Sequence, residues 1–211
     1  DQFFFFFSAE DGIRMQHFTL LLDRSGSIAT IDASLLDGAG ELIADLDDET
    51  LVTIVPFSST VHAHTTSDKQ TASTLLRQVA SPSGTTCLWD AIAQTVSGQL
   101  GELDHGPHTI AIVTDGLDTC SREHDARSAH DLISDAKEAG FHIFFVGTNI
   151  DATQVAGQIG VAPGQALNFA PNTDGARNAM RSLSAAVRRS ASVERGESAD
   201  FLQVERTESM A

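Results

Sequence analysis

The segment 18–27 constrains the fold most, because it joins a continuous apolar run to a short polar string. Residues 18–22 (Phe-Thr-Leu-Leu-Leu) lack the alternation of a strand with one wet face, which predicts a central strand buried on both sides. Asp23 follows at the carboxyl end of that strand, where open α/β sheets place their ligand sites. Together with the hydroxyls of Ser25 and Ser27, its carboxylate predicts a hard-oxygen site suited to Mg²⁺, or to Mn²⁺ or Ca²⁺.

An Asp-x-Ser-x-Ser string is also explained by a strand end followed by a helix cap, since Ser and Asp are both good capping residues. Two later segments favour the metal site. Residues 83–92 form a Gly/Ser/Thr loop that contains Thr86 and runs into a predicted helix. Residues 109–116 form a second apolar run that ends in Asp115 and a glycine. A threonine from a loop and an aspartate from a neighbouring strand end would complete an oxygen cage.

These three segments, and the order in which they occur, resemble the von Willebrand factor A (vWA) domain with a metal-ion-dependent adhesion site. The resemblance covers residues 15–189, and the passage 146–152 (Val-Gly-Thr-Asn-Ile-Asp-Ala) is similar to small stand-alone bacterial and phage members. It implies a doubly wound, Rossmann-like α/β fold with helices on both faces. The sheet would be mostly parallel, with one antiparallel edge strand.

The resemblance also implies how the site is shared among its residues. In the family, two serines and a threonine usually bind the ion directly, while the aspartates often act through water. Family loops commonly read Gly-Gly-Thr-Pro-Leu-Tyr-Asp-Ala, and aligning residues 88–91 (Leu-Trp-Asp-Ala) with the end of that string selects Thr86, with Thr85 as the alternative. The expected metal site is therefore Asp23, Ser25, Ser27, Thr86 and Asp115.

Length and charge limit the classes of function. A chain of 211 residues is long enough for one α/β domain with a substantial core. A net charge of −16 argues against sequence-independent binding to nucleic acid or to anionic membranes, both of which need basic patches. No apolar run reaches the roughly 18–20 residues of a membrane span. We therefore expect neither nucleic acid nor membrane as a partner.

The chain has two cysteines, Cys87 and Cys120, without the spacing of a structural zinc site. Two free thiols in a reducing cytosol is the preferred interpretation. The alternative is that the two cysteines form a redox pair that controls the loop containing Thr86, because the predicted fold brings both residues to the same face. Localisation is predicted to be cytoplasmic, since no export signal is recognised once the first fourteen residues are set aside.

The two ends of the chain differ from its middle. Residues 1–14 carry five consecutive phenylalanines, and the string that follows resembles a translated sequencing adapter, so we expect a non-native leader that ends before Met15. The segment 190–211 loses periodicity and becomes polar, which predicts a mobile tail. Docking of a partner by Phe201, Leu202 and Val204 is the alternative.

Between the ends, hydrophobic periodicity predicts the remaining elements. Helices are expected over residues 28–46, 71–79, 88–100, 121–139 and 174–189, with a short one ending near residue 157. Strands are expected over residues 51–57, 141–147 and 166–170, and residues 61–65 suit an antiparallel edge strand. His62 and His64 on that strand fit an exposed edge better than a metal site, because no third ligand is evident. Asp90 is expected to order the loop that contains Thr86 or the start of the helix 88–100 that follows it.

The chemistry of the predicted site favours binding over catalysis. If hydroxyls supply the inner shell, the ion keeps its charge, and an Asp or Glu of a protein partner can complete the coordination. The first hypothesis is a divalent-cation-dependent protein-binding module that is not an enzyme. By analogy with stand-alone bacterial relatives, an AAA+ ATPase is a candidate partner. The alternatives are a Mg²⁺-dependent phosphoester hydrolase, with His124 or Asp118 as its base, and a scaffold with a vestigial site.

Overall fold

The computed structural model describes residues 15–62, 67–101, 106–191 and 199–211. Six strands of this part form one sheet in the order β3-β2-β1-β4-β5-β6. The strands are β1 (His17–Asp23), β2 (Leu51–Phe57), β3 (Ser67–Asp68), β4 (His108–Thr114), β5 (His142–Gly147) and β6 (Ala166–Asn168). Neighbouring strands pair in parallel, apart from the antiparallel pair of β2 and β3 at one edge. The predicted doubly wound α/β fold is confirmed.

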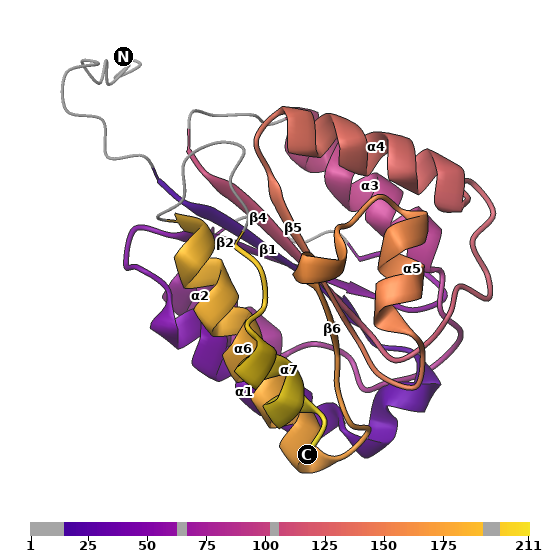
Figure 1. The fold of residues 1–211 in the computed structure, drawn as a ribbon. Helices are drawn as coiled ribbons and strands as arrows, with labels where there is room; N and C mark the ends of the chain where they lie inside the picture. The colour runs from indigo at the N-terminus through magenta and orange to yellow at the C-terminus, as the bar shows by residue number, and fades with distance from the viewer. Residues whose placement is uncertain (1–14, 63–66, 102–105, 192–198) are drawn as a thin grey trace, which may run out of the picture.

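Helices cover both faces of the sheet (Figure 1). They are α1 (Asp32–Asp45), α2 (Lys69–Arg77), α3 (Leu88–Gly101), α4 (Ala126–Glu138), α5 (Ala152–Gln158), α6 (Thr173–Ala191) and α7 (Gln203–Ser209), with 3₁₀ helices η1 (Gly26–Thr30) and η2 (Pro163–Gln165). The helices α1, α2 and α6 lie on one face, and α3, α4 and α5 lie on the other. Within the described residues, no helix has the length and apolarity that a membrane crossing needs.

Alternate residues of the central strands feed two separate hydrophobic cores. Leu20 and Leu22 of β1 belong to the core under α1 and α6, whereas Leu21 belongs to the core under α3 and α4. Phe144 and Phe145 of β5 divide in the same way. Burial on both faces explains why these strands are continuous apolar runs in the sequence.

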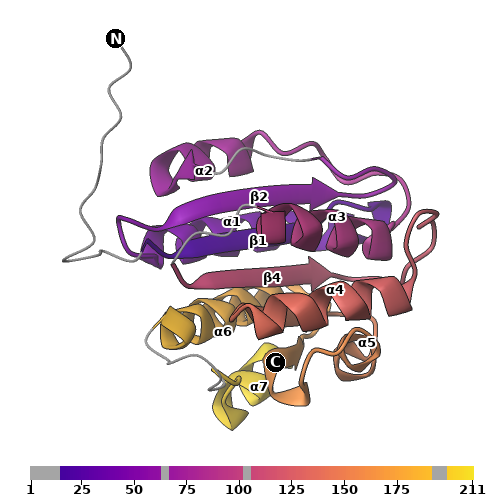
Figure 2. The same ribbon diagram turned by 90° about the horizontal axis from the view of Figure 1, so that it is seen from above.

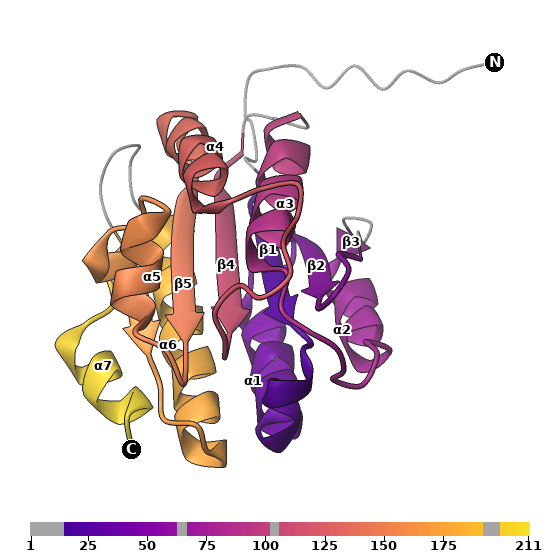
Figure 3. The same cartoon turned by 90° about the vertical axis from the view of Figure 1, so that its right-hand side faces the viewer.

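The parallel strands bring the predicted site segments to one edge of the sheet. The strand β1 lies between β2 and β4 (Figure 2), and the arrows of β4 and β5 point the same way (Figure 3). Leu22 pairs with Val113, so the residues that follow β1 and β4 leave the sheet side by side. Open α/β sheets bind their ligands at this carboxyl edge of the strands.

The antiparallel edge strand exists, but it begins later than predicted. The strand β3 consists of Ser67 and Asp68, whereas the prediction placed it at residues 61–65. Val61 makes only an isolated antiparallel bridge to Phe57, because the chain turns at Ser58, whose N–H donates to the Thr60 carbonyl at 3.0 Å. The described His62 is exposed, and His64 lies outside the described residues.

The predicted helix 28–46 is divided into η1 and α1 at Ile31. The helix α1 then packs closely on α6 because it has a glycine at the crossing. A Cβ atom on Gly38 would lie 2.7 Å from Cβ of Met180, closer than side-chain atoms approach in proteins. Gly38 therefore sets the separation of these two helices.

The prediction of a mobile tail is wrong for residues 199–211. Phe201 is buried and packs edge-on against Phe144 of the sheet, with ring centres 5.4 Å apart. The helix α7 then lies along α6, where Glu205 forms a two-pronged ion pair with Arg189. The predicted leader, residues 1–14, lies outside the described residues.

Candidate functional site

The carboxylate of Asp23 is fully buried at the end of β1, and both of its oxygens accept hydrogen bonds. Its Oδ1 accepts the backbone N–H of Ser25 at 2.7 Å, and its Oδ2 accepts the hydroxyl of Thr114 at 2.6 Å. Thr114 ends β4, so the carboxylate joins the carboxyl ends of two neighbouring strands. Asp23 thereby fixes the turn that presents the two serines.

The two serines face Asp115, which follows β4. The hydroxyl oxygens of Ser25 and Ser27 are 3.1 Å apart, and the Ser27 hydroxyl donates to Oδ1 of Asp115 at 2.8 Å. Ser25 is buried, whereas Ser27 is exposed at the rim. Oxygens from two of the three predicted segments therefore lie within hydrogen-bond distance of one another.

The third segment is held against the first two by backbone contacts. The N–H of Gly26 donates to the Gly84 carbonyl at 3.1 Å. This bond fastens the loop that contains Thr86 (the threonine loop) to the turn that carries Ser25 and Ser27 (the serine turn). Thr86 is buried, and its hydroxyl oxygen would lie 3.5 Å from a Cβ atom on Gly116, the residue after Asp115. The loop thus places Thr86 beside the Asp115 end of the site.

The alternative threonine, Thr85, faces elsewhere. Its hydroxyl lies 3.0 Å from that of Ser59, and its N–H donates to the same Ser59 oxygen at 2.9 Å. Thr85 is also exposed, whereas Thr86 is 5% exposed. These contacts favour Thr86 over Thr85 as the threonine of the site.

Asp115 carries the clearest electrostatic signature. Its Oδ2 is buried and has no hydrogen-bond partner among the described residues. Burial raises the pKa of its carboxyl above the ordinary value; hydrogen bonds from Ser27 and Ser25 oppose this effect, and the charge of Asp23 adds to it. A cation beside Asp115 would supply the charge and the partner that this oxygen lacks, so the residues fit a divalent ion.

The donor set is rich in hydroxyls. In the described part of the chain, no three His, Cys, Asp or Glu side chains gather in a group able to hold a metal. Two carboxylates with serine and threonine hydroxyls suit a hard cation such as Mg²⁺ better than a soft one.

The loop after Asp115 is anchored by a buried carboxylate. Asp90 accepts the backbone N–H groups of Arg122 at 2.9 Å and of His124 at 2.8 Å. It also accepts the N–H of Glu123 at 3.1 Å. Asp90 was predicted to order the loop that contains Thr86 or the start of the helix after it; its carboxylate instead holds the loop that follows Asp115. Asp118, considered as a base, instead accepts hydrogen bonds from Ser121 and from the N–H of Trp89.

The prediction of two free thiols is wrong, because Cys87 and Cys120 form a disulfide. Their Cα atoms are 4.7 Å apart, since the neighbouring residues Thr86 and Thr119 pair through their backbones. The alternative, in which the fold brings the two cysteines together as a pair, is the one observed. The disulfide joins the threonine loop to the loop that follows Asp115.

Arg24 has a structural role that the sequence did not reveal. Its buried guanidinium forms an ion pair with Asp32 and donates to the Ala80 carbonyl, at 2.9 Å from Nη2. It therefore braces the start of α1 against the loop after α2. This leaves Arg24 engaged and unsuited to holding a phosphate group.

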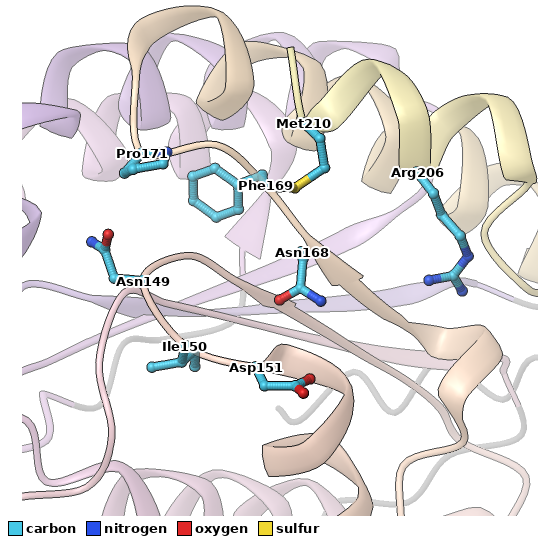
Figure 4. A pocket seen from close by; sticks show the side chains of 8 residues that line it. All are labelled: Asn149, Ile150, Asp151, Asn168, Phe169, Pro171, Arg206 and Met210. Carbon is cyan, nitrogen blue, oxygen red and sulfur yellow. The ribbon is translucent and has the colours of Figure 1, made fainter.

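A separate hollow of about 710 Å³ lies where β5 and β6 end, under α7 (Figure 4). It is lined by Asn149, Ile150, Asp151, Asn168, Phe169, Pro171, Arg206 and Met210. Three of its polar side chains already have structural partners. Asn168 accepts the N–H of Ala152, Asp151 caps α5, and Arg206 donates to the Ala166 carbonyl. Sequence reasoning assigned no function to it.

The fold and the cluster of oxygens at the strand ends together define a class of protein. The family model described as von Willebrand factor type A domain matches residues 18–184, and the chain belongs to that family. No protein of curated function matches the sequence. Family membership and the observed sheet agree with the resemblance drawn from the motif.

Several solved structures share the fold at low sequence identity. Proximal thread matrix protein 1 from the mussel byssus, solved with a zinc-occupied MIDAS motif, has a TM-score of 0.66 at 14% identity, covering 81% of this chain and 45% of that one. BatB from Bacteroides thetaiotaomicron, a conserved hypothetical protein, has a TM-score of 0.63 at 15% identity, covering 85% of this chain and 100% of that one.

The pilus adhesin SpaC from Lactobacillus rhamnosus GG has a TM-score of 0.69 at 12% identity, covering 86% of this chain and 32% of the adhesin. The chain thus spans about half the length of the mussel protein, at 45%, and about a third of the adhesin, at 32%. At these identities the likeness shows the fold alone.

Proposed function

We propose that the chain is a divalent-cation-dependent protein-binding module. In this proposal Ser25, Ser27 and Thr86 bind Mg²⁺ directly, and Asp23 and Asp115 support it through water. Members of this family are generally interaction or adhesion modules, and the structural neighbours include an adhesin and a matrix protein. The mussel protein holds zinc at its MIDAS motif, which supports a metal at the corresponding place.

One observation carries the proposal. Asp115 shares a hydrogen bond with Ser27 across the ends of two strands, while its other oxygen is buried without a partner. A buried carboxylate in this state costs stability unless a positive group approaches it. A cation between the serine turn and Asp115 removes that cost. The site is therefore formed before the cation arrives and is stabilised when it binds.

The partner follows from the donor set. Hydroxyl ligands leave the charge of a bound Mg²⁺ largely uncancelled, so a carboxylate is the group best suited to its open coordination position. We propose an Asp or Glu side chain of a protein as that group. The AAA+ ATPase expected by analogy stays a prediction.

A binding role also agrees with the state of the candidate base. Oδ1 of Asp118 accepts hydrogen bonds from the Ser121 hydroxyl and from the N–H of Trp89, and these bonds shape its loop. A hydrolase would need a base free to take a proton from water. The engagement of Asp118 in its loop therefore argues against Asp118 as that base, and His124 is the other candidate for a hydrolase.

Panning a random peptide library on the immobilised protein tests this proposal. In the presence of Mg²⁺ we expect peptides that carry Asp or Glu to be retained and to be released by EDTA. The Ser25→Ala/Ser27→Ala variant is expected to retain none of them while its circular dichroism spectrum is unchanged. Retention of the same peptides by this variant, or in EDTA, would count against the proposal.

A further inference from the structure

The loop that follows Asp115 is fastened at both of its ends. At one end, Asp115 continues directly from β4 and accepts the Ser27 hydroxyl at 2.8 Å. At the other end, Asp90 accepts three consecutive backbone N–H groups, those of residues 122–124. The carboxylate of Asp90, a residue that is 9% exposed, is largely shielded from solvent, and these part-buried bonds hold the end of the loop on α3.

The middle of the same loop is fastened to the threonine of the proposed site. The N–H of Thr86 donates to the hydroxyl of Thr119 at 3.0 Å, and the N–H of Thr119 donates to the Thr86 carbonyl at 2.8 Å. The next residue on each side, Cys87 and Cys120, forms the disulfide. Thr86 is therefore held by two hydrogen bonds and, one residue away, by a covalent bond.

The two cysteines differ in exposure. Cys87 is 6% exposed, whereas Cys120 is half-buried in the loop that borders the site. Access to one sulfur is what thiol exchange requires, so a small thiol is expected to attack Cys120 first. The bond is therefore reached from solvent on its Cys120 side.

We propose that the Cys87–Cys120 disulfide is a redox-sensitive positioning bond, and that its reduction lowers the affinity of the site for divalent cations. Reduction leaves the middle of the loop to hydrogen bonds such as those between Thr86 and Thr119, while Asp90 and Asp115 retain its ends. Thr86 then moves among several positions and must be ordered again when the cation binds. A site that is ordered before its ligand arrives binds that ligand more tightly, so the loss of order at Thr86 lowers the affinity for the cation.

The chemical step is an ordinary thiol–disulfide exchange with a dithiol reductant. A thiolate of the reductant attacks Sγ of Cys120 and forms a mixed disulfide, and Cys87 leaves as a thiolate that takes up a proton. The second thiol of the reductant then displaces Cys120 and closes its own disulfide. The protein gains two electrons and two protons, which the dithiol supplies.

The inference rests on the proposed function, because it concerns the affinity of that same site. It adds that the affinity depends on the compartment. Where the surroundings are oxidising the bond persists and Thr86 is held; in a reducing cytosol the pair is a dithiol and the site is weaker.

The test compares three samples of the whole protein by calorimetric titration with MgCl₂. They are the oxidised protein, the protein reduced with dithiothreitol, and the Cys87→Ser/Cys120→Ser variant. Free thiols are counted beforehand, and we expect none in the oxidised protein and two after reduction. We expect reduction to weaken Mg²⁺ binding about tenfold, within the usual range of coupling between two sites. The variant should match the reduced protein with or without the reductant.

Amide hydrogen exchange in the absence of a cation provides a second readout that does not depend on metal binding. Reduction is expected to speed exchange at Thr86 and Thr119 about tenfold while leaving the amides of residues 122–124, held by Asp90, unchanged. Equal Mg²⁺ affinities for the oxidised and reduced proteins, or unchanged exchange at Thr86, would overturn the inference. If the oxidised protein binds no Mg²⁺, the proposed function fails and the inference fails with it.

Discussion

At the scale of single residues, the site is built around a carboxylate that the fold leaves incompletely satisfied. Asp23 has a hydrogen-bond donor on each oxygen, whereas Oδ2 of Asp115 has no partner among the described residues. The two aspartates are close enough for the charge of Asp23 to raise the pKa of Asp115. Such local conflicts are common where a protein keeps a binding site ready for its ligand.

Because the buried charge of Asp115 is unfavourable, Asp115→Asn is predicted to stabilise the cation-free protein at neutral pH. The folded-state pKa of Asp115 is raised, so its contribution is favourable below the unfolded-state pKa and is lost as the pH rises through the folded-state value. The asparagine removes the charge that causes this loss. We expect a gain on the order of 1 kcal/mol in the free energy of unfolding at pH 7, the usual size of a single-site effect.

Urea denaturation of the two cation-free proteins at pH 7 and near pH 3 measures this gain. The gain should shrink at the lower pH, where the carboxyl of the parent protein is protonated. A variant that is less stable than its parent at pH 7 would show that the Asp115 charge is stabilised by a group other than a cation.

Much of the site's geometry was predictable from residue order, and part of it was not. The carboxyl ends of two adjacent parallel strands had to place Asp23 and Asp115 together, and the spacing of the serines fixed their turn. The choice between Thr85 and Thr86 depends on Ser59, which is distant in sequence. That the site residues bind a metal stays a prediction.

At the scale of elements, burial on both faces made the sheet readable from sequence. The apolar runs of β1, β2, β4 and β5 were placed to within a residue or two. The strand β3 was misplaced, because two residues at an edge carry little pattern. The helix α7 was missed because its contacts, such as Arg189 with Glu205, join distant polar residues. Neither feature leaves a periodic signal in the sequence.

The crossing of α1 and α6 predicts opposite effects for two glycine substitutions. Gly38→Ala places a Cβ atom 2.7 Å from Cβ of Met180, and such overpacking usually costs about 1–3 kcal/mol. Its better helix propensity returns only about 1 kcal/mol. Gly98→Ala in α3 is the matched control, because its Cβ atom meets nothing within 4 Å.

We therefore expect Gly38→Ala to lower the free energy of unfolding and Gly98→Ala to raise it, by up to about 1 kcal/mol. Thermal denaturation followed by circular dichroism distinguishes the two. Stabilisation by both substitutions would mean that the two helices separate easily and that Gly38 does not set their distance.

At the scale of the whole molecule, the net charge limits which partners approach the site, and the docked C-terminal segment is part of the domain that carries it. The chain carries a net charge of −16, which repels an acidic partner at long range and favours divalent cations near its surface. Capture of a carboxylate is then plausible only where a bound cation reverses the local sign. The C-terminal segment completes the domain, since Phe201 packs against the same sheet that carries the site.

This docking predicts that Phe201→Ala destabilises the entire domain. The side chain is 4% exposed and contacts Phe144 in the core, and loss of a buried phenylalanine costs about 3 kcal/mol or more. Its neighbour Leu202 is 50% exposed, so Leu202→Ala should change the free energy of unfolding by less than about 0.5 kcal/mol. Urea denaturation measures both, and equal effects would contradict the docking of this segment.

In the proposed site, oxygens from three separate segments bind one divalent cation. The decisive experiment is calorimetric titration of the cation-free oxidised protein with MgCl₂, with Thr86→Val and Thr85→Val as a matched pair of variants. We predict one Mg²⁺ per chain for the parent and for Thr85→Val, and binding weakened at least tenfold for Thr86→Val. The absence of binding heat in the parent at several temperatures, or equal affinities for the two variants, would contradict the claim.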